Sequence, residues 1–425
     1  MEYLLFVVYL ILFAWLVTKV KFFSHSGLSR SQLIIVFLLK VMAGIFYGWI
    51  GLYYGGLAQM VDTWSFHYNG INEYHLLFNN PHEYFVNLFR NPYENGTYKF
   101  FSSDDSYWNI LKGYVVIKIL SVFNILSFGH YYVNVIFYSF ITLLGPLAIY
   151  RVMTDVFPTK KLSILLAIFL VPSFLFWTSG IHKEGLIFTA IGMIIYSIYF
   201  GTKEKKIGII RILSLLTGLM LILALRNFLI VLLIPAIIVW LLANRRPKYS
   251  LVIFSLSYVV MCILFFTIRY IDPRLDFPQA VVNKQHEFLS LQGGLSNIPL
   301  NELHPNAVSF LKTTPQAITN STIRPFPSDV HHILSLAAAI ETDCLLLIFL
   351  LFLISRSNGL RSRNLMYFST FFSFSLLLAI GFSVNNLGAI VRYRSVILPL
   401  LVIPMAAQVD WKKIESFFLN NKTTS

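Results

Sequence analysis

Charge is scarce in this chain, because only 12% of its 425 residues are Asp, Glu, Lys or Arg. Soluble domains carry about 25% charged residues, and a water-soluble globule could not bury an apolar share of 57%. The composition therefore excludes a nucleic-acid-binding domain, a disordered tail protein and a secreted disulfide scaffold. It predicts a membrane protein, in which the formal charge of +14 has to be interpreted by position.

Cysteine is nearly missing, and several well-known functional motifs are missing altogether. The two cysteines, Cys262 and Cys344, fall inside apolar runs, so neither a disulfide framework nor a thiolate metal site is predicted. The sequence contains no Walker A loop, dinucleotide fingerprint, serine-hydrolase elbow or HExxH motif. ATP-driven transport by this chain is therefore not expected.

The chain contains many long apolar runs. A helix of about 20 apolar residues crosses a hydrocarbon core about 30 Å thick. Runs near that length cover residues 3–18, 33–57, 131–150, 162–178, 186–201, 207–225, 227–243, 249–270, 333–355, 365–384 and 395–409. The predicted fold class is all-α: a polytopic transmembrane helical bundle with about eleven crossings. Because lysines follow the first run and none precedes it, that run is interpreted as a retained anchor.

Basic residues between the runs predict the topology. Clusters of Lys and Arg occur at 19–30, 151–161, 203–211, 245–248, 356–363 and 412–422, and the positive-inside rule places them in the cytoplasm. The segments 58–130 and 271–332 are then outer loops of a single transmembrane domain that spans residues 1–425, with the N-terminus outside and the C-terminus cytoplasmic.

Two parts of the first outer loop are expected to touch the membrane. The run 131–150 supplies the one crossing that the topology allows before the basic cluster at 151–161. The shorter, interrupted segment 111–127 is therefore predicted to lie in the outer interface or to re-enter the membrane. The stretch 81–90 mixes aromatic and polar residues and is predicted to be a second interfacial helix.

Ionisable residues at membrane depth are costly, so each one in this chain is a candidate for function. Asp62 directly follows the second run, in a stretch rich in aromatic residues. A partly desolvated carboxylate there is suited to act as a general base or to bind a metal; the alternative is a solvated loop acid. His67 and His75 are interpreted as structural or solvent-facing histidines, not as metal ligands.

A polar turn between two runs holds Lys183 and Glu184. These two side chains are candidates for an ion pair that shapes the floor of a cavity, and Lys183 alone is suited to meet a phosphate. The alternative is a lysine that reaches the interface beside a glutamate that starts a helix. Arg226 lies at the outer end of another run and is a candidate partner for Glu341 or Asp343.

Arginines gather in two later outer segments. Arg392 and Arg394 open the last run, where positive charge is disfavoured on the outer side, and guanidinium groups bind phosphate oxygens in bidentate fashion. Arg324 lies in a stretch with two prolines, which form a stiff turn that would hold it against the membrane surface. The alternatives are generic anchoring for Arg392 and Arg394 and a rigid loop without a catalytic part for Arg324.

The order of these features resembles the GT-C superfamily of integral membrane glycosyltransferases, which use polyprenyl-phosphate sugars as donors. The resemblance is best over 33–201, and it rests on Asp62 after a helix, Leu-Phe-Asn-Asn-Pro-His-Glu-Tyr at 77–84, Phe128-Gly129, a helix running into Arg151 and Phe157, and a helix with Pro172 that ends at Phe176-Trp177 before a polar turn. In that superfamily the first outer-loop acid is catalytic, which implies this role for Asp62. Thr63 stands where many relatives carry a second acid, so metal dependence is left open. A further difference is the extra helix at 3–18, which precedes the one that bears the acid.

The resemblance implies an inverting glycosyltransferase of the plasma (inner) membrane that acts in cell-envelope polysaccharide synthesis. It would move sugar from a polyprenyl-phosphate-linked donor to a glycan or lipid-linked acceptor on the outer face. Asp62 would be catalytic, and the substrate and its phosphate would be bound by Arg392, Arg394, Arg324, Lys183, Glu184 and Arg226. No cofactor is assigned with certainty, and a divalent metal is left open.

Two other functions compete with this one. The Asn-Leu-Gly, Arg-Tyr-Arg and Pro pattern over 386–399 and the Arg-Pro-Phe-Pro at 324–327 resemble polymerases of the O-antigen type, which join whole lipid-linked repeat units. A flippase or transporter of an anionic lipid-linked substrate is the other alternative. Transporters place charges near the bilayer midplane and often show paired halves, whereas the charges here are predicted at one face, which favours the enzyme.

Overall fold

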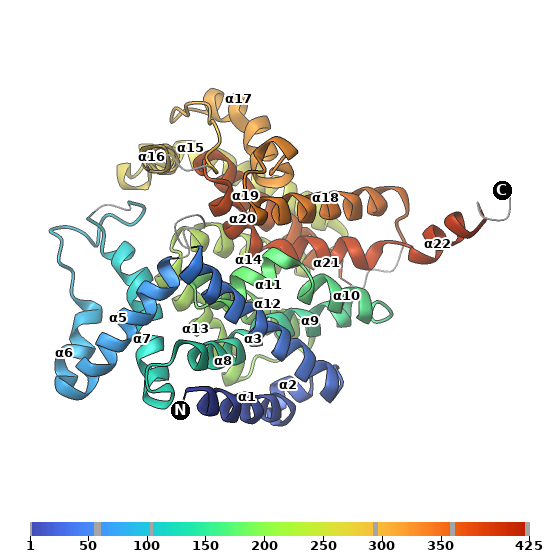
Figure 1. Cartoon of the computed structure of the whole chain (residues 1–425). Helices are drawn as coiled ribbons and strands as arrows, with labels where there is room; N and C mark the ends of the chain where they lie inside the picture. The colour runs from blue at the N-terminus through green and yellow to red at the C-terminus, as the bar shows by residue number, and fades with distance from the viewer. Residues whose placement is uncertain (1, 55–60, 103–104, 292–295, 358–361, 421–425) are drawn as a thin grey trace. The chain divides into compact units, whose positions relative to one another are not determined.

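The computed structural model describes every residue except 1, 55–60, 103–104, 292–295, 358–361 and 421–425 (Figure 1). The described residues form helices and the segments that connect them, and the only β-type pairings among them are two isolated bridges. Within the described part of the chain, nine helices are long and apolar enough to cross a membrane, or up to eleven if each of two bent pairs is one span. The predicted fold class, an all-α polytopic bundle, is confirmed.

The chain divides into two compact units, each made of two stretches of sequence. Unit 1 comprises Met1–Val152 and Phe174–Val231, and unit 2 comprises Met153–Ser173 and Leu232–Ser425. Small parts of the predicted outer loops, residues 58–60, 103–104 and 292–295, lie outside the described residues, as do Arg361 and Lys422 of the basic clusters.

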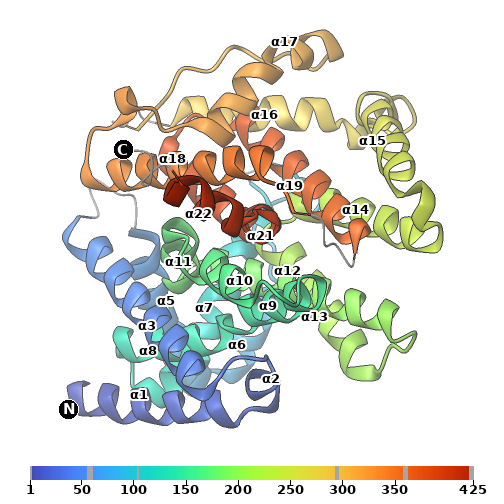
Figure 2. The ribbon, with the colours of Figure 1, turned by 90° about the vertical axis from the view of Figure 1, so that its right-hand side faces the viewer.

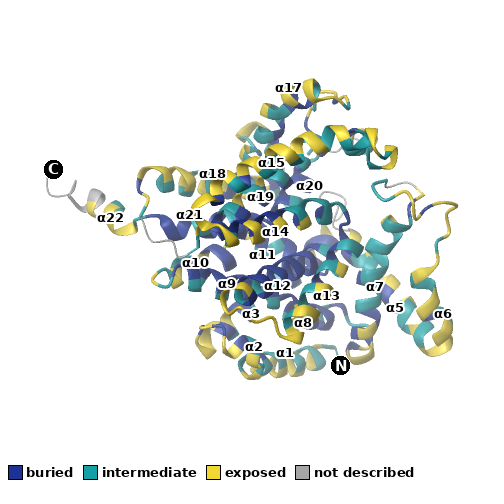
Figure 3. Ribbon diagram, turned by 180° about the vertical axis from the view of Figure 1, so that it is seen from behind, coloured by how far each residue is buried: buried dark blue, intermediate teal, exposed yellow. Residues whose placement is uncertain are grey.

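Unit 1 carries the first predicted outer loop and the polar turn. Its helices are α1 (Glu2–Lys19), α2 (Lys21–Ser24), α3 (Arg30–Tyr53), α5 (Val61–Asn79), α6 (Pro81–Val86), α7 (Tyr107–Ser127), α8 (Tyr131–Thr142), most of α9 (Leu144–Val156) and α11 (Pro172–Ser179), α12 (Lys183–Lys203) and α13 (Ile209–Leu225). The main packing pairs are α12 with α13, α5 with α7, and α3 with α8. Helix α12 forms the centre, because most of its side chains are buried (Figure 3).

Local sequence explains where α3 begins and why α9 and α12 approach closely. Ser29 accepts a hydrogen bond from the Gln32 amide at 3.2 Å, and the Gln32 side chain accepts one from the Ser29 amide at 2.9 Å; this capping box satisfies two backbone donors of the first turn. A Cβ added at Gly145 of α9 would lie 2.6 Å from Thr189 Cα of α12. Only glycine lets these two helix backbones meet.

Unit 2 carries the second predicted outer loop and the arginine-rich segments. Its helices are α10 (Lys161–Phe169), most of α14 (Phe228–Arg245), α15 (Ser250–Thr267), α16 (Phe277–Ser290), α17 (Ala307–Ile318), α18 (Ile333–Ile354), α19 (Arg363–Ser383), α20 (Leu387–Ser395), α21 (Leu398–Gln408) and α22 (Trp411–Asn420). Helices α16 and α17 pack on α19 (Figure 2). Phe310 of α17 fills a small apolar cluster with Val282 and Leu303.

Several predicted runs differ in detail from the observed helices. Residues 162–178 form α10 and α11, which are bent by 57° at a break, and the last run belongs to α20 and α21, which are bent by 65°. Both breaks come just before a proline, Pro172 or Pro399, whose missing N–H and fixed φ suit the start of a new helix. The run 33–57 ends at Tyr53, and its residues 55–57 lie outside the described part of the chain.

The segment 111–127 differs most from its prediction. It belongs to an unbroken helix of 21 residues, α7, which is long and apolar enough to cross a membrane. The run 207–225 is α13, a 17-residue apolar helix that is shorter than these candidate spans. The upper count of eleven therefore includes α7 and leaves out α13, the reverse of what the sequence predicted.

The predicted helix at 81–90 is present as α6 followed by a short 3-10 helix, Asn87–Phe89. Phe85 and Phe89 are exposed on it. A partly buried ion pair beside it fixes its place in unit 1, because Glu73 accepts from Lys118 at 2.6 Å and from Asn87 at 2.9 Å. The exposed rings suit a membrane interface, and that location stays a prediction.

Candidate functional site

Asp62 lies at the beginning of α5, not in a loop as the sequence suggested. It is in the first turn of this helix, where free backbone N–H groups favour a negative charge. Its side chain is 51% exposed. The carboxylate is therefore fixed by a helix end and remains accessible to a second molecule.

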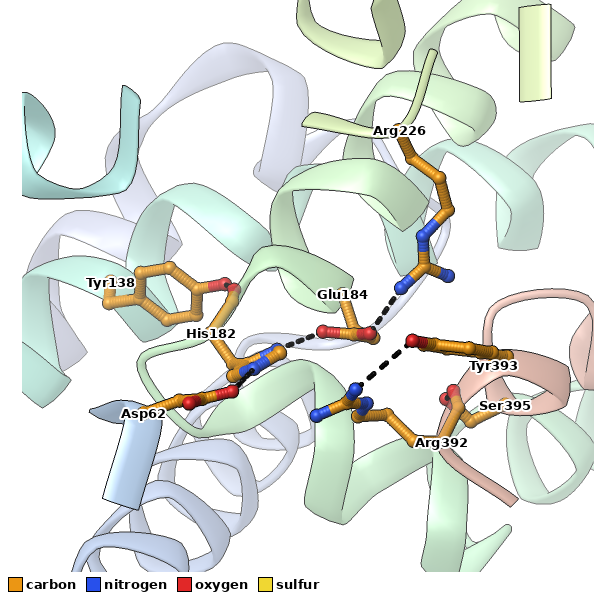
Figure 4. A network of polar contacts seen from close by, with 8 residues as sticks. All are labelled: Asp62, Tyr138, His182, Glu184, Arg226, Arg392, Tyr393 and Ser395. Atoms are coloured by element: carbon orange, nitrogen blue, oxygen red, sulfur yellow. Dashed lines mark hydrogen bonds and ion pairs between the residues drawn. The ribbon is translucent and has the colours of Figure 1, made fainter. Parts of the chain in front are cut away.

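His182 contacts Asp62 from the polar turn between α11 and α12. Its Nε2 lies 3.5 Å from Asp62 Oδ2, and its Nδ1 is hydrogen-bonded to Glu184 Oε2 (Figure 4). The ring is 1% exposed, although Asp62 itself is open. His182 thus links the accessible carboxylate to the buried interior of unit 1.

Glu184 is fully buried in the first turn of α12, and its charge is matched by Arg226. Arg226 NH2 donates to Glu184 Oε1 at 2.6 Å from the position that ends α13. A buried carboxylate is tolerated only when a cation and further hydrogen bonds compensate for its lost hydration. The sequence analysis paired Glu184 with its neighbour Lys183 and Arg226 with an acid of α18. Arg226 and His182 are two partners of Glu184 in the structure, and its predicted pairing with Lys183 stays a prediction.

Lys183 lies beside the aromatic ring of Phe66 of α5, with its Nζ 5.8 Å from the ring centroid. This distance is in the range of a cation–π contact. Lys183 is thus placed close in sequence and in space to the two helices that carry Asp62 and Glu184. Its predicted contact with a phosphate stays a prediction.

The turn that carries His182 is held by buried polar groups. Lys40 Nζ donates to the Thr178 carbonyl at 2.7 Å and to Ser179 Oγ at 3.4 Å. Tyr138 of α8 donates its hydroxyl hydrogen to the carbonyl of His182. Gly180 is required here, because a Cβ at this position would lie 2.2 Å from the Tyr47 ring. The backbone around His182 is therefore fixed on both sides.

Aromatic residues surround the first turns of α5. Trp64 donates to the Gly48 carbonyl at 2.9 Å and stacks on Tyr131, with ring centroids 4.2 Å apart. Burial, with a smaller contribution from His130, lowers the pKa of His67 to about 4, so this ring is neutral at pH 7. No cluster of three His, Cys, Asp or Glu side chains that could hold a metal occurs among the described residues.

Arg394 is a buried structural residue of unit 2 and lies near the end of a helix, whereas the sequence predicted it at the start of the last apolar run. It lies in the last turn of α20 and is 2% exposed. Its guanidinium donates to the Arg324 carbonyl at 2.8 Å, to Thr342 Oγ1 at 2.7 Å and to the Ser321 carbonyl at 3.4 Å. These bonds tie the end of the second predicted outer loop to α18 and α20.

Arg392 and Arg324 are more accessible than Arg394. Arg392 is half-buried, and its NH2 lies 3.2 Å from the Tyr393 hydroxyl (Figure 4). Arg324 NH1 is 3.5 Å from Asp329 Oδ1, and its guanidinium lies 5.2 Å from the Phe326 ring centroid. The predicted anion binding by these arginines stays a prediction.

Glu341, the acid that the sequence analysis offered to Arg226, is bound within unit 2. Its two carboxylate oxygens accept from the Ser173 hydroxyl at 2.6 Å and the Ser173 amide at 2.5 Å. Asp343 is exposed on the same helix, α18. These two hydrogen bonds therefore hold Ser173, which follows the break between α10 and α11, against α18.

The structure brings Asp62, Glu184 and Arg226 of the predicted set into one continuous chain of contacts within unit 1. The link is His182, a residue that the sequence analysis did not select. The available signal was its place directly before Lys183 and Glu184, in a tight turn between glycines. Arg392, Arg394 and Arg324 belong to unit 2, and their predicted participation in the same site stays a prediction. Comparisons with protein-family models, curated proteins and solved structures found no match to this chain.

Proposed function

We propose that the protein is a membrane glycosyltransferase that moves sugar from a polyprenyl-phosphate carrier to an acceptor hydroxyl on the extracytoplasmic face, in the synthesis of a cell-surface glycan. The observation that supports it best is Asp62, an accessible carboxylate at a helix end that is backed by the buried His182, Glu184 and Arg226. Such a carboxylate is suited to take a proton from a hydroxyl group. The assignment of a sugar donor on a lipid carrier rests on the GT-C resemblance.

In the proposed reaction, the acceptor oxygen attacks the anomeric carbon of the donor while Asp62 removes the hydroxyl proton. The new bond joins the acceptor oxygen to the anomeric carbon, and the bond from that carbon to the phosphate oxygen breaks. The phosphate leaves with the bonding electron pair, and the proton stays on Asp62. Attack from the side opposite the phosphate inverts the anomeric configuration.

Negative charge grows on the leaving phosphate, and a nearby cation would stabilise it in the transition state. Lys183 is the proposed donor, because it belongs to unit 1 like Asp62, and its Nζ lies 5.8 Å from the ring of Phe66 on the helix that carries Asp62. Arg226 supports the structure around it in this account. The parts predicted for Arg392, Arg394 and Arg324, which belong to unit 2, stay predictions.

The first test is to weigh the lipid-linked glycans of cells that carry the wild-type protein, Asp62→Asn or Asp62→Ala. General-base catalysis contributes about 10²- to 10⁴-fold, so both variants should lose transfer by at least about 100-fold. Asp105→Asn is the matched control: this acid of the same predicted loop is exposed and lies 3.8 Å from Lys99, and its loss should change nothing.

The mass that accumulates identifies the reaction. A lipid-linked glycan that stops one sugar short would indicate transfer of a single sugar. Accumulation of one complete repeat unit would indicate a polymerase. An unchanged glycan profile in Asp62→Asn would contradict the enzyme and favour transport or assembly.

A further inference from the structure

We infer that His182 is the positioning residue that holds Asp62 in its carboxylate form, ready to accept a proton. The inference rests on the proposed function, and it concerns a residue to which the sequence analysis gave no part. It is based on one buried imidazole that lies between carboxylates of two different helices, Asp62 of α5 and Glu184 of α12 (Figure 4).

Glu184 determines the protonation of Nδ1, one of the two ring nitrogens of His182. A carboxylate that is paired with a guanidinium is an acceptor only, and Arg226 NH2 lies 2.6 Å from Glu184 Oε1. The other oxygen, Oε2, contacts Nδ1 of His182. Nδ1 therefore carries a hydrogen and donates it to Glu184.

The second ring nitrogen faces Asp62, and this contact needs a proton. Nε2 lies 3.5 Å from Asp62 Oδ2. A bare ring nitrogen and a carboxylate oxygen are both acceptors and would repel each other, so one proton has to lie between them. When the ring holds that proton, Asp62 is a carboxylate, which is the form that can accept a proton from a hydroxyl group.

The surroundings of His182 keep its ring from turning away. The side chain is 1% exposed, and its carbonyl accepts from Tyr138. The charged, titratable and aromatic groups placed around the ring are Asp62 and Phe66 of α5, Lys183 and Glu184 of α12, Arg226 after α13, Tyr138 of α8, Trp177 of α11, and Tyr47 and Lys40 of α3. Glu184 and Asp62 are the two that contact the ring nitrogens.

Nitrogen-15 NMR of histidine-labelled protein in lipid nanodiscs tests the proton arrangement without any sugar transfer. The His182 signals are identified by their loss in His182→Gln. We expect both ring nitrogens of the wild type to carry a proton at the pH of the transfer assay, and we expect Nε2 to lose it in Asp62→Asn. A wild-type ring whose Nε2 is bare would overturn the inference.

The pH profile of transfer tests what the arrangement does for the reaction. Glutamine keeps a neutral donor near the Nε2 position, so His182→Gln should remain active at pH values above the acid limb of the pH–rate profile. Removing the cationic donor disfavours the charged form of Asp62, so the half-point of the acid limb should move to higher pH by about one unit. His182→Phe lacks any donor and should lower kcat by about 100-fold, while KM changes less than about twofold because His182 does not face the substrate.

The two readouts separate the inference from the proposed function. Wild-type kcat and an unmoved acid limb in both His182 variants would overturn the inference and leave the glycosyltransferase standing. Absence of sugar transfer by the wild type would overturn the proposed function, and the NMR result would still decide how His182 and Asp62 share their proton.

Discussion

At the scale of the residue, Asp62 and Glu184 show how surroundings divide the roles of two carboxylates. Asp62 is 51% exposed and Glu184 is fully buried, yet the same imidazole contacts both. The buried acid has a guanidinium partner at 2.6 Å, which offsets the cost of removing it from water. Glu184 is therefore suited to hold its neighbours in place, and Asp62 is suited to meet a second molecule.

Glu184→Gln should destabilise the protein, because it leaves the Arg226 guanidinium buried without its counter-charge. Removal of one partner of a buried ion pair costs about 3–5 kcal/mol. Thermal unfolding in detergent should show this as a large fall in the midpoint temperature.

Glu204→Gln is the control for that measurement. Glu204 is 50% exposed and pairs with Arg211 at 2.7 Å, and exposed pairs contribute about 0–1 kcal/mol. If the two variants unfolded at the same temperature, the role given to the buried pair would be wrong.

Sequence reasoning selected Asp62 but not His182, and the physical cause is clear. An acid directly after a long apolar run is conspicuous, because few charges are tolerated near membrane depth. A histidine in a polar turn carries no sign of the carboxylate that the distant helix α5 brings to it. Arg392 and Arg394 likewise look alike in sequence, but only Arg394 is buried against backbone carbonyls.

At the scale of the element, helices break and meet where proline and glycine allow it. The bends before Pro172 and Pro399 divide two apolar runs that look continuous in sequence. The run at 111–127 was judged interrupted because of its lysines and asparagine, but α7 buries Asn124 and pairs Lys118 with Glu73. Polar residues that find partners across helices do not interrupt a helix.

Gly145→Ala tests the close packing of α9 on α12. The added methyl group would lie 2.6 Å from Thr189 Cα and 3.0 Å from the Phe188 carbonyl oxygen, so the two backbones would have to separate. Overpacking of this kind costs about 1–3 kcal/mol, which thermal unfolding of the purified protein should detect.

Gly113→Ala in α7 is the matched control, because its new methyl group would meet only Phe66, at 3.8 Å. Alanine is the better helix former, so this variant should be as stable as the wild type or more stable. Equal stability of the two alanine variants would refute the close approach of α9 and α12.

At the scale of the whole molecule, the bilayer explains why the helical fold could be predicted from sequence. Its thickness fixes the length of a crossing helix, and most predicted runs correspond to observed helices within a few residues. The division into two compact units could not be predicted, because each unit joins stretches that are distant in sequence. Such packing depends on contacts between helices, which hydropathy alone does not specify.

The predicted topology has the N-terminus outside and the C-terminus in the cytoplasm. The reason is that Lys412, Lys413 and Lys422 follow the last apolar run and favour the cytoplasmic side. A green fluorescent protein fused to the C-terminus should fluoresce, and an alkaline phosphatase fused there should be inactive. A tag at the N-terminus of the protein should be accessible from outside intact cells. Termini on the same side would mean an even number of crossings, as expected if α7 crosses in addition to the eleven predicted runs.

The most direct test of the central claim is to incubate purified wild-type protein or Asp62→Asn with a lipid extract from cells that lack the protein, and to weigh the lipid-linked glycans over time. The account predicts that the wild type increases the glycan mass by one sugar or one repeat unit, whereas Asp62→Asn binds the donor lipid and leaves every mass unchanged. A mass increase by Asp62→Asn at the wild-type rate would contradict Asp62 as the catalytic base.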